Sequence, residues 1–155
     1  MQRKTYIGFL NPKHFPDLKV QAYFWYYRVQ KLVELGASRN KLVLGIPTYG
    51  RSFTLTSSIN VHPPNAYFIN GGSPGPILNQ VGFLGYQEIC LFMNNEGWSK
   101  IDDINGPYAY KGNQWVGFDT IECAQRKAQY VMDENLGGAM FWDTSTDDFN
   151  VSELQ

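Results

Sequence analysis

The stretch Lys41–Leu55, with the sequence KLVLGIPTYGRSFTL, restricts the fold of this chain more than any other part. Its first half, Leu42–Ile46, is an apolar run with a single glycine, and Pro47 ends it. Because both faces of such a run are apolar, it predicts a fully buried strand of a parallel sheet. After Pro47 the pattern alternates, as on an antiparallel strand with one solvated face: Arg51, Phe53 and Leu55 against Ser52, Thr54 and Thr56.

Two helix–strand units are predicted in the chain. Apolar residues recur at helical spacing from Ala22 up to Gly36, which ends the helix before the first strand. Asp119 and Glu122 form a capping-box pattern with Asp119 as the N-cap, and a helix follows up to Asn135. The apolar face of that helix is predicted as Ile121, Ala124, Ala128 and Val131. Leu136–Trp142 then predicts a second short, buried parallel strand, whereas residues 1–20 have no sustained period and predict a loop.

Residues 52–118 differ in kind from both flanks. They are rich in turn signals, such as Pro63-Pro64 and Pro74-Gly75-Pro76. A short helix is predicted near Leu84–Met93, and a hairpin about Lys111-Gly112-Asn113. This segment is therefore predicted to be a small, mostly antiparallel module between the two helix–strand units.

Three blocks of the sequence resemble, in order, parts of family-18 chitinases and chitinase-like proteins. Lys41–Leu55 resembles the seventh barrel strand of that family and the entry into its inserted α+β domain. Pro107–Asp119, PYAYKGNQWVGFD, resembles the end of the insertion. Gly137–Trp142, followed by Asp147-Asp148-Phe149, resembles the eighth strand. The resemblance covers roughly residues 20–150.

The resemblance implies an α/β fold: a partial TIM (β/α)8 barrel, with the sixth helix and strands seven and eight, carrying an inserted α+β domain. Residues 1–51 and 119–155 would form the barrel part, and 52–118 the insertion. A complete barrel needs ~250 residues, more than the 155 present. The N-terminus shows no signal peptide, whereas the family is usually secreted. We therefore expect the C-terminal part of an extracellular parent protein.

The resemblance also fixes what catalysis would require. Family-18 enzymes hydrolyse β-1,4-linked N-acetylglucosamine polymers by substrate assistance, in which the sugar's acetamido group attacks and one carboxylic acid protonates the leaving oxygen. That acid ends a D-x-x-D-x-D-x-E motif on the fourth strand, and no carboxylate of this sequence stands in such a motif. The Met-x-Tyr-Asp segment of the sixth strand is also absent. We assign no catalytic residue and expect this chain to be inactive alone.

Five residues match the family's sugar-binding cleft. Trp142 matches the tryptophan that stacks under the central sugar ring, and a core tryptophan is the alternative. Met140 would lie beside it, with core packing as the better interpretation. Tyr49 and Arg51 match residues that hydrogen-bond the sugar, and for Arg51 a solvated ion-pair partner is the less favoured alternative. Gln80 stands where many relatives carry a substrate-contacting glutamate. Asp143 follows Trp142 where small residues are usual.

Composition excludes several other classes of function. The 13 basic and 14 acidic side chains nearly balance, so no nucleic-acid or anionic membrane partner is indicated. His14 and His62 lack partners at ligand spacing, and no phosphate-binding glycine loop occurs, so no metal and no cofactor is expected. Aromatic residues make up 15% of the chain, which suits sugar faces and packed cores equally. The predicted partner is chitin or a chito-oligosaccharide.

Two questions stay open at the level of sequence. In the resembled family the cysteine at the position of Cys90 commonly pairs with one just past residue 149, which this sequence lacks; a reduced Cys90 and a bridge to Cys123 both remain. The parent is an enzyme, a non-catalytic lectin or growth-factor-like relative, or a truncated gene product with no independent activity. Chain-length preference and oligomeric state do not follow from the sequence.

Overall fold

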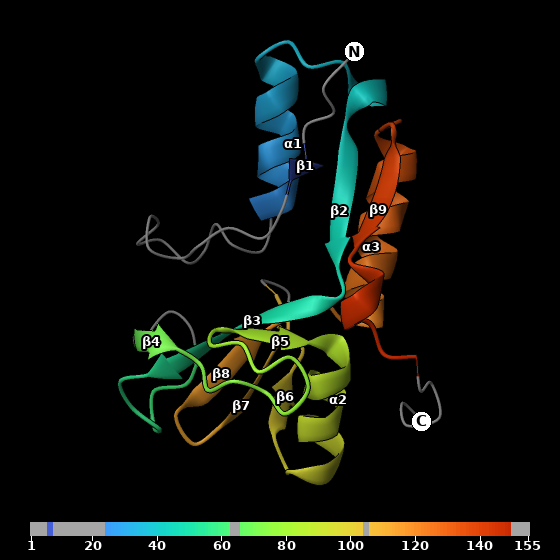
Figure 1. Cartoon of the computed structure of the whole chain (residues 1–155). Helices are drawn as coiled ribbons and strands as arrows, with labels where there is room; N and C mark the ends of the chain where they lie inside the picture. The colour runs from blue at the N-terminus through green and yellow to red at the C-terminus, as the bar shows by residue number, and fades with distance from the viewer. Residues whose placement is uncertain (1–5, 8–23, 63–65, 104–105, 150–155) are drawn as a thin grey trace.

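A computed structural model of the chain describes residues 6–7, 24–62, 66–103 and 106–149, which form two sheets (Figure 1). The first sheet is parallel, with the strand order β1-β2-β9. Its strands are β1 (Tyr6–Ile7), β2 (Val43–Pro47) and β9 (Gly138–Trp142). The second sheet is antiparallel and contains all the other strands among these residues.

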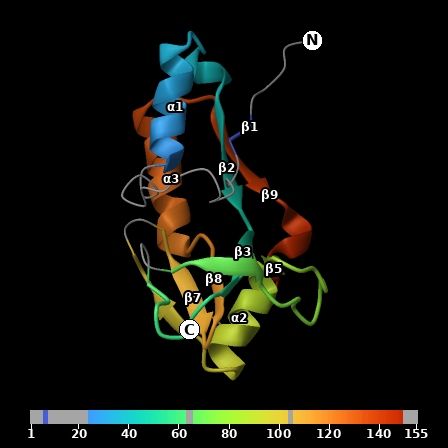
Figure 2. The ribbon, with the colours of Figure 1, turned by 90° about the vertical axis from the view of Figure 1, so that its left-hand side faces the viewer.

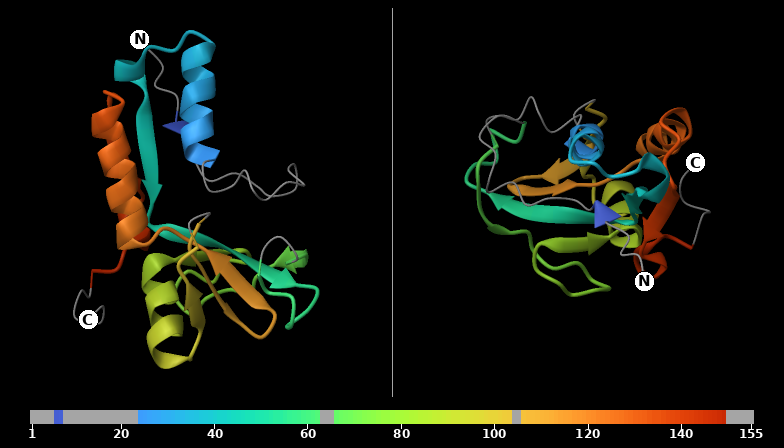
Figure 3. Two further views of the ribbon diagram at one scale, coloured as in Figure 1. Left: turned by 180° about the vertical axis from the view of Figure 1, so that it is seen from behind. Right: turned by 90° about the horizontal axis from the view of Figure 1, so that it is seen from above.

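Two helices, α1 (Phe24–Glu34) and α3 (Ile121–Asp133), cover one face of the parallel sheet (Figures 2 and 3). Each helix precedes the strand it packs near, as predicted for two helix–strand units. Gly36 lies two residues past the end of α1 and has a φ of 93°. Glycine adopts this left-handed conformation without strain, whereas a residue with a side chain would be strained there. A 3-10 turn, η3 (Arg39–Lys41), then leads into β2.

Buried side chains join the two helices to the sheet. Val29 from α1, Tyr130 from α3, and Leu42 and Leu44 from the strand region form one core cluster. An ion pair between Arg39 and Glu134 links the 3-10 turn before β2 to the end of α3. The cluster explains why β2 lies against both helices although they are far apart in the sequence.

The antiparallel sheet has the order β4-β3-β8-β7-β6, and β5 pairs with the same edge of β3 as β4 does. Its strands are β3 (Tyr49–Leu55), β4 (Phe68–Gly71), β5 (Phe83–Gly85), β6 (Ser99–Ile101), β7 (Tyr108–Lys111) and β8 (Gln114–Gly117). The predicted hairpin is confirmed, because Lys111 pairs with Gln114 across a two-residue turn. Gly112 has a φ of 57° there, which glycine adopts without strain.

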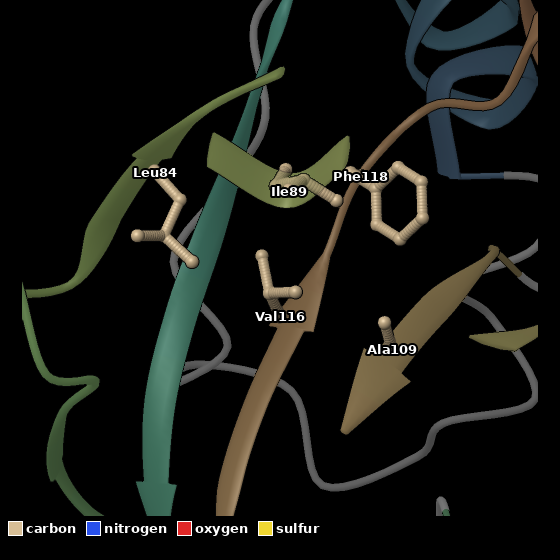
Figure 4. Packing of buried hydrophobic residues seen from close by; sticks show 5 residues of the cluster. All are labelled: Leu84, Ile89, Ala109, Val116 and Phe118. Atoms are coloured by element: carbon tan, nitrogen blue, oxygen red, sulfur yellow. The ribbon is translucent and has the colours of Figure 1, made fainter. Parts of the chain in front are cut away.

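One helix, α2 (Tyr86–Asn95), covers one face of the antiparallel sheet. Leu84, Ile89, Ala109, Val116 and Phe118 point toward one another between helix and strands (Figure 4). The short helix predicted near Leu84–Met93 is thus confirmed, displaced by two residues at each end.

Both predictions of a fully buried parallel strand were wrong. In β2 burial alternates: Leu44 and Ile46 are buried, whereas Val43, Gly45 and Pro47 are half-buried. In β9, Phe141 and Trp142 are each 58% exposed. Parallel pairing itself is confirmed by the register from Val43–Gly138 to Pro47–Trp142. The difference arises because, among the described residues, helices cover only one face of this sheet and β9 pairs on one edge only.

Helix α3 departs from its prediction in two ways. Its N-cap is Thr120, whose side chain accepts a hydrogen bond from the Cys123 amide, and not Asp119. Its buried face is Cys123, Lys127 and Tyr130, whereas Ile121 is exposed. Asp119 is instead buried in an ion pair with Lys127. Because the lysine faces the interior, the predicted apolar face of the helix is partly turned toward solvent.

Two smaller predictions also fail. Residues 1–20 contain strand β1, which pairs with β2 over only two residues, too few to give a periodic signal. The remainder of that segment, and the predicted helix start at Ala22, lie outside the described residues. On β3, Ser52 is buried and Arg51 exposed, the reverse of the predicted solvated face. A register shift between Thr54 and Leu55 changes the alternation, so Leu55 is buried as well.

Candidate functional site

The carboxyl ends of β2 and β9 meet the start of β3, and Thr48 joins them (Figure 1). The Thr48 amide donates to the Trp142 carbonyl at 3.0 Å, and the Thr48 carbonyl accepts from the Tyr86 amide at 3.1 Å. Its hydroxyl donates to the Asp143 carbonyl and lies 2.9 Å from the Thr146 hydroxyl. This buried threonine therefore fixes the end of β9 relative to β3 and to the start of α2.

Tyr49 and Arg51 lie on β3 directly after Thr48, and β5 brings Phe83 beside them. The register pairs Arg51 with Phe83 and Tyr49 with Gly85. The rings of Tyr49 and Phe83 stack at 4.7 Å with an interplanar angle of 26°. The guanidinium carbon of Arg51 lies 5.5 Å from the Tyr49 ring centroid and 5.1 Å from that of Phe83. Two predicted site residues are thus in contact, together with a third that the sequence interpretation missed.

Trp142 is the last residue of β9, and its peptide bond to Asp143 is cis. The register places Trp142 beside Pro47 and Met140 beside Gly45. Because Ile46 and Phe141 alternate with these residues, Met140 and Trp142 lie on the sheet face opposite α1 and α3. With 58% of its surface exposed, Trp142 is not a core residue of the structure, whereas Met140 is half-buried.

Gln80 is exposed in the loop between β4 and β5. Among the interactions of the described residues, none connects Gln80 to Tyr49, Arg51 or Trp142. Its loop is nevertheless held firmly, because the buried Glu88 of α2 accepts two backbone hydrogen bonds from the loop and a third from Gly85 at the end of β5. They come from Ile77, Leu78 and Gly85 at 2.7, 2.8 and 2.9 Å.

A pocket of about 110 Å³ lies behind the strand ends, and the predicted site residues do not line it. Ile46, Phe141 and Ala124 line it on the helix side, together with Tyr86. Burial raises the pKa of the Tyr86 phenol to about 12, so this group stays protonated near neutral pH. Tyr49, Arg51 and Trp142 instead belong to an open surface.

Asp119, Cys123 and Lys127 form a buried polar cluster at the start of α3. Lys127 donates to one oxygen of Asp119, and the Cys123 thiol donates to the other at 3.3 Å. Burial raises the pKa of that thiol to about 11, which makes it a poor nucleophile. Neither Cys90 nor Cys123 is disulfide-bonded.

The described part of the chain contains neither a metal centre nor a membrane-spanning helix. None of its clusters of histidine, cysteine and carboxylate side chains is arranged to hold a metal ion. His62 instead contacts the Tyr108 hydroxyl at 2.7 Å. Within the same residues, every helix is too short or too polar to span a membrane. Pro107 lies with Asp102, Asp103, Glu122 and Arg126 around a second pocket, of mixed charge.

The arrangement offers aromatic faces and a guanidinium, groups of the kind that stack on a ligand or donate hydrogen bonds to it. Asp143 is the carboxyl nearest in sequence to Trp142, and its side chain accepts from the Ser145 hydroxyl. Two residues that shape this region, Glu88 and Phe83, were missed from the sequence, and only Glu88 had a usable signal. Glu88 follows the N-cap Gly85 by three positions, the spacing of a capping box. Phe83 had none on its own, because only the β3–β5 register reveals its partner.

Proteins of one family resemble this chain in sequence and in fold. The profile of Glycosyl hydrolases family 18 matches residues 9–147. Human Chitinase-3-like protein 2 is 44% identical over 124 residues, which are 79% of this chain and 31% of that protein. Catalytic domain 2 of the Group II chitinase of Ostrinia furnacalis superposes with a TM-score of 0.78 at 36% identity, over 83% of this chain and 34% of that one.

A further neighbour is human YKL-39, described as a pseudo-chitinase with retained chitooligosaccharide binding properties. It superposes with a TM-score of 0.74 at 41% identity, over 83% of this chain and 35% of its own. This chain thus spans about a third of the length of these three relatives. Because the family profile covers most of its length, the chain belongs to glycosyl hydrolase family 18.

Proposed function

We propose that this chain carries one part of the chitin-binding cleft of an extracellular chitinase-like protein. In this proposal residues 1–51 and 119–155 are a segment of the barrel, with β2 and β9 as its seventh and eighth strands. Residues 52–118 are the inserted α+β domain. The parallel pairing of β2 with β9 and the antiparallel sheet that begins at β3 support this division.

The observation that carries the proposal is that Tyr49 and Arg51 contact each other and Phe83 beside the strand junction at which Trp142 ends β9. Tyr49, Arg51 and Phe83 are in mutual contact, and the Thr48–Trp142 hydrogen bond ties the exposed Trp142 to the same strand junction. Flat rings pack against the apolar faces of sugars, and a guanidinium donates to their oxygens. Gln80 and Met140 complete the proposed binding surface.

We further propose that the chain by itself binds and does not hydrolyse. Cleavage of a glycoside needs a positioned acid whose pKa lies near the working pH, so that it both holds a proton and transfers it to the leaving oxygen. The sequence holds no D-x-x-D-x-D-x-E motif, and Tyr49, Arg51 and Trp142 are not acids of that kind. The retained binding of the pseudo-chitinase YKL-39 favours a lectin-like parent, whereas the Ostrinia chitinase favours a hydrolytic one.

Two assays on the full chain test this proposal. We expect it to co-sediment with insoluble chitin and not with cellulose, which lacks the acetamido groups. We also expect no release of fluorophore from a fluorogenic chitobioside. Equal retention on both polymers would contradict the assignment of the ligand. Turnover that survives purification and disappears in Asp143→Asn would contradict the assignment as a non-hydrolytic chain.

A further inference from the structure

We propose that Phe83 is a positioning residue of the sugar-binding surface, which holds the Arg51 guanidinium in one orientation before a ligand arrives. The inference rests on the proposed function, because orienting Arg51 in advance helps binding only if Arg51 contacts the sugar. Its geometric part concerns this chain's own residues and can be tested without any sugar.

The position of Phe83 follows from the strand register. Arg51 and Phe83 are directly opposite on β3 and β5, so their side chains leave the sheet on the same face. Tyr49 is two residues before Arg51 and shares that face. The two rings stack on each other, and both centroids lie within 6 Å of the guanidinium carbon, at 5.1 and 5.5 Å.

Phe83 is not explained by core packing. The next residue, Leu84, belongs to the buried cluster under α2, whereas Phe83 alternates to the other face and is only half-buried. Phe83 is not among the half-buried residues that pack against that cluster, and its ring stacks on Tyr49. The ring-stacking and cation–π contacts of Phe83 among the described residues are with two proposed binding residues.

The physical effect is on the freedom of Arg51. An exposed arginine samples many rotamers, and a ligand that uses its guanidinium has to restrict them on binding. Two aromatic faces beside the guanidinium favour one set of rotamers in the unliganded protein. Binding through Arg51 then costs less ordering, so Phe83 acts on affinity through the arginine.

The test follows the rate at which phenylglyoxal modifies each arginine, measured by peptide mass spectrometry on the full chain. In Phe83→Met, which keeps the volume and loses the ring, we expect Arg51 to react about two- to fivefold faster than in the wild type, the factor expected for loss of an exposed cation–π contact. Phe83→Tyr keeps a ring and should restore the slow rate. Arg126 is exposed on α3 and provides the internal reference, with an unchanged rate in every variant that folds.

A second ring-free variant, Phe83→Leu, must give the same acceleration. If Arg51 reacts equally fast in the wild type and in a folded ring-free variant, the positioning role is wrong. The same experiment with chitohexaose present separates the two proposals. Protection of Arg51 in the wild type, weakened in Phe83→Met and restored in Phe83→Tyr, is expected. Absence of protection in the wild type contradicts the proposed function, and the rates without sugar still decide the role of Phe83.

Discussion

At the scale of single residues, burial decides what the polar groups of this chain can do. Asp119 and Lys127 are almost completely enclosed and compensate each other's charge. Removing one partner of such a pair leaves an uncompensated buried charge, which is the costly case. Cys123 joins this pair as a hydrogen-bond donor. The cluster therefore stabilises the first turns of α3, and burial makes its thiol unreactive.

The raised pKa values predict a loss of stability in alkali. The Cys123 thiol has a pKa of about 11 in the folded chain against an ordinary value of 9.0, chiefly because burial disfavours the thiolate. The folded state therefore holds this proton more tightly, and that stabilisation is complete below pH 9 and lost as pH rises through 11. Tyr86 acts in the same direction between pH 10 and about 12.

We expect the free energy of unfolding, measured with urea, to fall between about pH 9 and about pH 11. A shift of two pKa units corresponds to at most about 3 kcal/mol for Cys123. In Cys123→Ala the fall over this interval should become smaller, whatever the variant's stability at neutral pH. An identical pH profile in wild type and Cys123→Ala would show that the thiol does not titrate as the structure requires.

At the scale of elements, local pattern predicted which segments form and how they pair, and it failed on burial. Apolar runs identified β2 and β9, and the spacing to Gly36 identified α1. Whether Phe141 is covered depends on neighbours that no local pattern contains. Likewise the local pattern indicates a surface position for Lys127, and only the fold shows that it is buried against Asp119. Of the site, Tyr49, Arg51 and Trp142 could be named from the resemblance, whereas Phe83 required the register of two strands.

The loop from β4 to β5 is held by one carboxylate, which makes its stability predictable. In Glu88→Gln, the amide nitrogen cannot accept a hydrogen bond, so at least one of the three backbone donors loses its acceptor. We expect a loss of about 2–3 kcal/mol in the free energy of unfolding. The amides of Ile77, Leu78 and Gly85 should also exchange with solvent faster than in the wild type.

The matched control is Glu96→Gln, at the C-cap of the same helix. Glu96 pairs with Lys111 at 3.7 Å, with both side chains about half exposed, and such a pair contributes less than about 1 kcal/mol. If Glu88→Gln were as mild as Glu96→Gln, the carboxylate would not be what holds the loop.

At the scale of the whole molecule, the parallel sheet has an open edge. Among the described residues β9 pairs only with β2, and Phe141 and Trp142 are exposed beside that edge. An unpaired strand with apolar side chains is a template for pairing with another chain. We expect the isolated 155-residue chain to self-associate in light scattering after size exclusion, and Phe141→Lys to reduce the mass observed. A monodisperse monomer with cooperative unfolding would contradict this expectation.

The most direct test of the account is the affinity of the full chain for chitohexaose, measured by calorimetry in the wild type and in Trp142→Ala. If Trp142 is the exposed platform of a partial sugar cleft, the wild type binds with millimolar affinity. The loss of one stacked ring, worth on the order of 1 kcal/mol, then weakens binding by about fivefold. Trp142→Phe, which keeps a ring, should lose less. Binding by the wild type that is unchanged in Trp142→Ala, or no binding at all, would contradict the account.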